Sequence, residues 1–88
     1  MKIKENFVLR ELCGSFVVVA GGEQTLNFKG LIKLNETGAF LWERLMNHTT
    51  IEELCADMVR EYDIDESTAK RDIEAFIKIL SDNNLLEQ

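Results

Sequence analysis

The sequence of 88 residues predicts an α+β fold in which strands come first and helices follow. Two observations indicate this order. Up to about residue 34, the apolar segments are rich in β-branched and aromatic residues and are separated by glycine-containing turns. From Asn35 onward, apolar residues recur at spacings of three and four, which is the helical period. A chain of this length has room for one core, so we expect residues 1–88 to form a single domain.

The strand region contains a predicted hairpin and a shorter third strand. Residues 7–12 and 16–20 are strand-forming, and Gly14 between them suits a tight turn because glycine accepts a positive φ. An alternating stretch at 26–28 and a turn then lead to residues 31–34, which we predict as a short strand. A strand this short is a good candidate for the edge of a sheet.

Each predicted helix begins with a capping residue. Asn35 is suited to cap a helix over 36–46, and Asp65 a helix over 66–81. Thr50, followed three residues later by Glu53, forms a capping box before the second helix. The second helix has the cleanest apolar stripe, made of Ile51, Leu54, Cys55, Met58, Val59 and Tyr62. Strands followed by three helices favour a winged-helix-like arrangement, with an antiparallel sheet of three strands covered on one face.

Composition argues against several classes of partner. The formal net charge is −6, with ten Lys and Arg against sixteen Asp and Glu, which disfavours a nucleic-acid partner. No apolar run is long enough to span a membrane, and the N-terminus lacks the pattern of a signal peptide. We therefore expect a cytoplasmic protein with neither a membrane nor a nucleic-acid partner.

No set of residues carries a recognisable catalytic or metal-binding pattern. His48 is the only histidine, and Cys13 and Cys55 lack the spacing of a metal site. We interpret His48 as a loop residue, Cys55 as a small buried hydrophobe, and both cysteines as free thiols. Asp63 and Asp65 are better explained as helix-end residues than as a calcium loop. We predict that the chain is not an enzyme and uses no cofactor or metal.

The third predicted helix has a second line of residues beside its main stripe. Asp72, Ala75 and Ile79 form this line, and Ile79 lies about 60° around the helix from Phe76. The line is either the margin of the core or one wall of an exposed groove, and the sequence leaves both alternatives open. An unpaired strand edge beside such a groove would accept an extended peptide as an additional strand.

Residues 30–42, with the sequence GLIKLNETGAFLW, resemble the PqqD family. The shared pattern is a glycine, a short apolar strand, the Leu34-Asn35 junction, a small residue and then a helix with Leu and Trp. The resemblance continues through residues 50–54, 63–65, 72–76 and 85–86, and so covers nearly the whole chain. Each piece is weak alone, but the ordered set is fairly specific.

The resemblance implies a winged-helix-like fold and a function as a recognition element for ribosomally made, later modified peptides. Such proteins are peptide chaperones that hold the leader segment of a precursor and present it to a modifying enzyme, often a radical-SAM protein. The leader pairs with the third strand and packs against the third helix. Carried onto this chain, the peptide-binding residues are Leu31, Ile32, Lys33, Leu34, Asp72, Ala75, Phe76 and Ile79. The pattern names neither the precursor nor the pathway.

Other interpretations remain at this point. A winged-helix DNA-binding regulator would place the third helix in a major groove, where Lys70, Arg71 and Lys78 are interspersed with acidic residues. A structural or inhibitory module without a peptide partner is a further alternative. A second copy of the chain is another candidate to occupy the free strand edge, which would give a homodimer.

Overall fold

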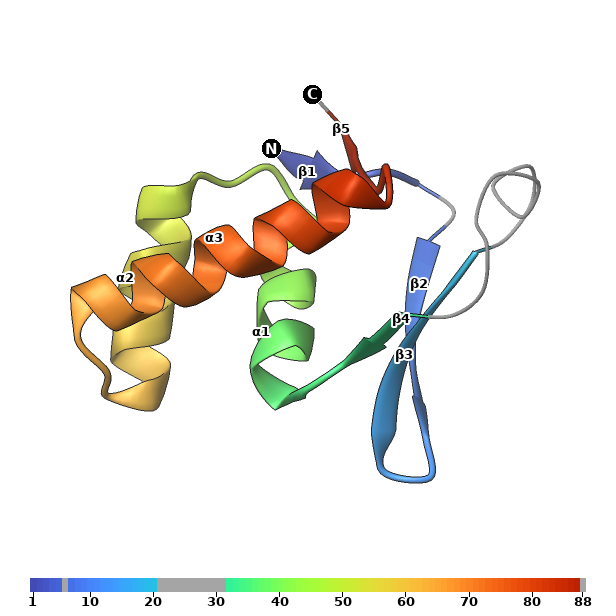
Figure 1. Ribbon diagram of the computed structural model, residues 1–88, viewed down its shortest axis with the longest axis horizontal. Helices are drawn as coiled ribbons and strands as arrows, with labels where there is room; N and C mark the ends of the chain where they lie inside the picture. Colours follow the sequence, from blue (N-terminus) through green and yellow to red (C-terminus); the bar gives the residue numbers. More distant parts are fainter. Residues whose placement is uncertain (6, 21–31, 88) are drawn as a thin grey trace.

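The structure is a computed structural model that describes residues 1–5, 7–20 and 32–87. Within these ranges it is an α+β fold, with a small sheet and three helices lying to one side of it (Figure 1). The predicted fold class is therefore confirmed. The alternating stretch at 26–28 and Leu31, the first residue of the predicted third strand, lie outside the described residues.

The larger sheet consists of β2 (Phe7–Leu12), β3 (Ser15–Ala20) and β4 (Ile32–Leu34), all antiparallel in the order β2-β3-β4. The turn between β2 and β3 has positive φ at two residues, 51° at Cys13 and 80° at Gly14. These values are typical of a type I′ turn, whose twist matches that of the flanking strands. The hairpin and the role of Gly14 are confirmed, whereas the positive φ of Cys13 was not predicted.

The three helices begin at the predicted caps. They are α1 (Glu36–Leu45), α2 (Ile51–Tyr62) and α3 (Glu66–Asp82). The side chains of Asn35, Thr50 and Asp65 accept hydrogen bonds from backbone N–H groups three residues on, at 2.7, 3.1 and 2.7 Å. A side-chain acceptor at this position satisfies one of the N–H groups that a helix leaves unpaired at its start.

The two ends of the described chain form a second, very short sheet that the sequence did not indicate. β1 (Lys2–Ile3) pairs antiparallel with β5 (Leu86–Glu87), and the Lys4 N–H donates to Leu85 O at 2.8 Å. The chain ends consequently lie side by side near the end of α3 (Figure 1). Leu85 is fully buried, so this segment folds back onto the core.

One apolar core joins the inner face of the sheet to the helices. Trp42 is 2% exposed and belongs to this core. Met46, which follows the last residue of α1, is 44% exposed. Other core side chains are Ile3, Phe7, Val18, Leu41, Leu45, Leu54, Met58, Ala69, Ile73, Phe76, Leu80 and Leu86. None of the helices in the described ranges is both long and apolar enough to cross a membrane.

Candidate functional site

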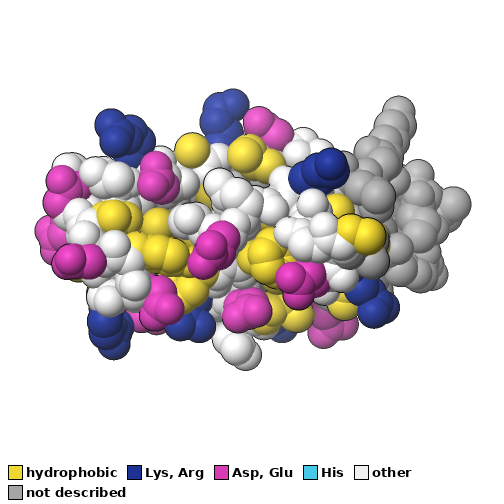
Figure 2. Space-filling model, turned by 90° about the horizontal axis from the view of Figure 1, so that it is seen from below, with side chains coloured by type: hydrophobic (Ala, Val, Ile, Leu, Met, Phe, Trp, Pro, Cys, Tyr) yellow, Lys and Arg dark blue, Asp and Glu magenta, His cyan; other side chains and the backbone are white. Residues whose placement is uncertain are grey.

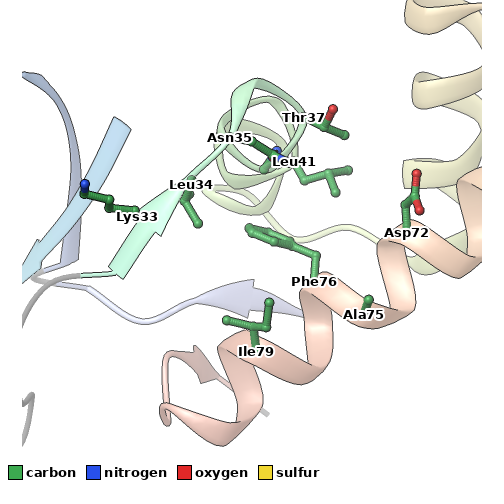
Figure 3. A pocket seen from close by; sticks show the side chains of 10 residues that line it. Lys33, Leu34, Asn35, Thr37, Leu41, Asp72, Ala75, Phe76 and Ile79 are labelled. Atoms are coloured by element: carbon green, nitrogen blue, oxygen red, sulfur yellow. The ribbon is translucent and has the colours of Figure 1, made fainter. Parts of the chain in front are cut away.

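A hollow of about 500 Å³ lies between β4, the first turns of α1, and α3 (Figure 3). Its lining residues are Lys33, Leu34, Asn35, Thr37, Gly38, Leu41, Asp72, Ala75, Phe76 and Ile79. The structure thus brings together all but two of the residues that the sequence suggested for peptide binding. Ile32 lies in β4 but packs against the core instead of lining the hollow. Leu31 lies outside the described residues.

The sequence left open whether Ile79 lies at the margin of the core or in the wall of a groove, and the structure places it in the wall. Ile79 is 46% exposed and lines the hollow, so it does not belong to the closed core. Phe76, one turn earlier, is 7% exposed and belongs to both the core and the hollow. Ala75, the residue before Phe76, is exposed and small, which keeps this wall open.

The α1 wall was not predicted. Gly38 lies in the first turn of α1 and brings this helix very close to its neighbours. A β-carbon at Gly38 would lie 3.2 Å from Asn35 Oδ1, 3.3 Å from Leu34 Cβ and 3.4 Å from Phe76 Cε1. Glycine therefore permits β4, α1 and α3 to meet at one point. The available signal was a glycine inside a helix, where this residue is unfavourable unless close packing requires it.

In the sheet that the described strands form, β4 is an edge strand. It pairs with β3 through Phe16↔Leu34, Val17↔Lys33 and Val18↔Ile32, and it is last in the strand order. Ile32 and Leu34 are half-buried and Lys33 is exposed, as expected for side chains that alternate between the two faces of a sheet. Figure 3 shows Leu34 pointing toward Phe76, whereas Lys33 points away from α3.

Two residues of opposite charge line the hollow, Lys33 on β4 and Asp72 on α3. Among the described residues, neither of them takes part in a salt bridge. The salt bridges found there join Arg44 and Arg60 to Asp57, and Lys78 to Asp82. On the face shown in Figure 2, hydrophobic side chains remain visible between acidic and basic ones.

The remaining chemically reactive side chains lie apart from the hollow. Burial is the main reason that the pKa of the Cys55 thiol is raised, so this thiol is less ionised at neutral pH than an ordinary cysteine. Cys13 is exposed in the β2–β3 turn, and both cysteines are free. His48 is exposed in the α1–α2 loop. The described ranges contain no group of three His, Cys, Asp or Glu side chains that would hold a metal.

Together, the fold and the hollow define a small winged-helix-like α+β protein with an apolar groove beside a sheet edge. The chain matches the family described as coenzyme PQQ synthesis protein D (PqqD) over residues 23–86, and it belongs to this family. This confirms the resemblance that the sequence suggested. Among curated proteins, no match was found.

Two solved structures are similar to the whole chain. The first, TbiB1 in complex with the TbiA(beta) leader peptide, has a TM-score of 0.78 and 28% identity, and the alignment covers 99% of this chain and 95% of that one. The second, a lasso peptide synthetase B1 complexed with the leader peptide, has a TM-score of 0.75 and 20% identity. That alignment covers 99% of this chain and 96% of the other, and at this identity it shows a shared fold.

Proposed function

We propose that this protein binds the leader segment of a ribosomally made precursor peptide by adding it as a strand to β4. The observation that carries the proposal is the position of the hollow, which lies between an edge strand and the partly exposed apolar flank of α3. A peptide strand at such an edge gains main-chain hydrogen bonds from β4, while its alternate side chains enter the groove.

Family membership and the solved structures support the same function. TbiB1, which shares 28% identity over 99% of this chain, was solved with a leader peptide bound. The PqqD match covers β4, all three helices and part of β5. Holding a leader requires no reacting group, so in this proposal the protein acts as a non-catalytic adaptor. Its proposed place of action is the cytoplasm. The protein presents the precursor to a separate modifying enzyme, with a radical-SAM protein as the first candidate.

The proposed site assigns a different role to each wall. β4, with Ile32, Lys33 and Leu34, is the strand beside which the leader pairs. Phe76, Ala75 and Ile79 receive apolar side chains of the leader, and Asp72 accepts hydrogen bonds at the end of the groove near Thr37 (Figure 3). The unpredicted residues Gly38 and Leu41 complete the groove on the α1 side.

An amide NMR titration tests the proposal. The probe is the leader segment of a small peptide encoded beside the gene, and a duplex DNA of similar charge is the control. We expect saturable shifts at residues 32–34 and 72–79 with the leader, and none with DNA. Shifts confined to α3 that appear with DNA alone would instead support the regulator interpretation.

A matched pair of variants tests the position of the groove. Ala75→Arg fills the hollow with a long side chain, whereas Ala56→Arg makes the same change at an exposed position on α2. We expect Ala75→Arg to weaken leader binding by at least about tenfold, which is 1.4 kcal/mol. Both variants should keep their stability within about 0.5 kcal/mol, because both positions are exposed on helices. Titration calorimetry and urea unfolding give the two quantities, and equal affinities for the two variants would argue against this groove.

A further inference from the structure

The register of the sheet determines which backbone groups of β4 face the free edge. In an antiparallel ladder, pairs that exchange both backbone hydrogen bonds alternate with pairs that exchange none. The β2–β3 hairpin has a two-residue turn closed by Leu12 and Ser15, so this pair is a hydrogen-bonded one. The register continues without a bulge, and Arg10↔Val17 is therefore the next hydrogen-bonded pair.

The same alternation then applies on the other side of β3. Because Ser15 and Val17 direct their backbone groups toward β2, Phe16 and Val18 direct theirs toward β4. Phe16↔Leu34 and Val18↔Ile32 are consequently the hydrogen-bonded pairs of the β3–β4 ladder. Lys33, opposite Val17, points its N–H and C=O away from β3 and toward the free edge.

At Asn35, the next residue in this alternation, the backbone carbonyl is already occupied. The backbone carbonyl of Asn35 accepts the Ala39 N–H at 2.9 Å, and its side chain accepts the Gly38 N–H at 2.7 Å. Within the described part of β4, Lys33 is thus the residue that offers both of its backbone groups to an added strand. Its side chain lies on the outer face of the sheet and points away from α3 (Figure 3).

We propose that Lys33 fixes the register of the bound peptide and selects an acidic residue at the paired position. This inference rests on the proposed function. The peptide residue that exchanges backbone hydrogen bonds with Lys33 has its side chain on the outer face, beside the ammonium group. Its two neighbours point to the inner face, toward Leu34, Phe76 and Ile79. The segment that binds is therefore apolar–acidic–apolar.

The charges around Lys33 favour a carboxylate at this position. The residue directly opposite Lys33 on β3 is Val17, which is uncharged. Arg10, the next residue in the same row, lies two strands away, about 10 Å, and is also a cation. No salt bridge in the described ranges involves Lys33, so its ammonium is available to an incoming carboxylate.

A peptide-display experiment tests the selection. The probe is a library of random twelve-residue peptides, selected against the wild-type protein and against Lys33→Glu, with Lys70→Glu as a control of equal charge change on exposed α3. Peptides whose NMR shifts map to β4 and α3 should carry Asp or Glu between two apolar residues. Selection against Lys33→Glu should replace this acid by Lys or Arg, and Lys70→Glu should leave it unchanged.

Titrations with one selected peptide quantify the pairing. Replacing its central Glu by Lys should weaken binding to wild type by about three- to tenfold, as expected for exchanging an attractive cross-strand pair for a repulsive one. Lys33→Glu should restore the affinity of the Lys peptide. N-methylation of the central amide should abolish binding, whereas N-methylation of either neighbouring amide should be tolerated, because those amides face away from Lys33.

The possible outcomes separate this inference from the proposed function. Peptides that occupy the groove without an acidic preference, or with a preference that survives Lys33→Glu, would overturn the role of Lys33 and leave leader binding intact. If N-methylation of a neighbouring amide abolishes binding while N-methylation of the central amide is tolerated, the proposed register is wrong. If no selected peptide perturbs β4 or α3, both the inference and the proposed function fail.

Discussion

Asn35 links the stability of α1 to the shape of the groove. Its side chain accepts the Gly38 N–H at 2.7 Å and also lines the hollow. Thr50 has the same capping role for α2, through the Glu53 N–H at 3.1 Å, but does not line the hollow. The two residues therefore form a natural pair for separating loss of stability from loss of binding.

We expect Asn35→Ala and Thr50→Ala each to lower the free energy of unfolding by about 1 kcal/mol, the usual cost of a lost cap. Asn35→Ala should in addition weaken leader binding by up to about fivefold, the factor that corresponds to 1 kcal/mol, because the first turn of α1 loosens at the groove wall. Urea unfolding and calorimetry measure the two effects. An equal loss of affinity in both variants would mean that Asn35 acts only through overall stability.

At the scale of the single helix, α3 begins with a carboxylate whose proton affinity depends on folding. The pKa of Asp65 is held below its ordinary value of 3.8, mainly by hydrogen bonding from Thr68, first from its side chain and then from its backbone N–H. Ser67 and Arg71 lower the pKa further, while partial desolvation opposes them. The folded protein thus binds this proton less tightly than the unfolded chain does.

The sign of the pH dependence follows from this depressed pKa. The stabilisation is complete well above pH 3.8, declines as the pH falls through 3.8, and is lost below the pKa of the folded state. Asp65→Asn keeps a capping side chain but cannot titrate, so its unfolding midpoint should fall less between pH 5 and pH 2 than that of wild type. Asp63→Asn controls for the change in net charge. Parallel midpoint curves for wild type and Asp65→Asn would contradict this account.

The elements that the sequence predicted well are those with a local cause. The caps at Asn35, Thr50 and Asp65 and the turn glycine Gly14 each act on neighbours within three residues. The pairing of β1 with β5 involves two residues on each strand, too few for an alternating pattern to be recognised, and it joins opposite ends of the chain. Sequence periodicity carries no information about such long-range contacts.

The candidate site shows the same distinction. The α3 wall was predicted because Asp72, Ala75 and Ile79 follow helical spacing beside a recognisable core stripe. The α1 wall was missed because Thr37 and Gly38 line the hollow only as a result of how β4, α1 and α3 meet. Tertiary packing, which no single-helix pattern contains, determined that part of the groove.

For the whole molecule, the free edge of β4 raises the question of self-association. An exposed edge is a template for pairing with any extended chain, including a second copy of the same protein. A symmetric antiparallel β4–β4 pair in which Lys33 exchanges hydrogen bonds with its counterpart would place two Lys33 ammonium groups side by side. Like charges at directly opposite positions destabilise a strand pair, so Lys33 disfavours this dimer while remaining available to an acidic peptide.

We expect Lys33→Thr to strengthen self-association by about two- to fivefold, since a like-charge cross-strand pair costs at most about 1 kcal/mol. Lys33→Glu retains a like-charge pair and should behave as wild type does, and Lys70→Thr on α3 controls for the change in net charge. Sedimentation velocity over a range of protein concentrations measures the dimer fraction. An acidic and an uncharged leader peptide should both compete with any Lys33→Thr dimer. Relative to its affinity for wild type, the acidic peptide should be the weaker competitor, because the ammonium that attracts the acid is gone. Self-association that is insensitive to both Lys33 variants would place the dimer contact on another surface and leave the β4 edge to the peptide.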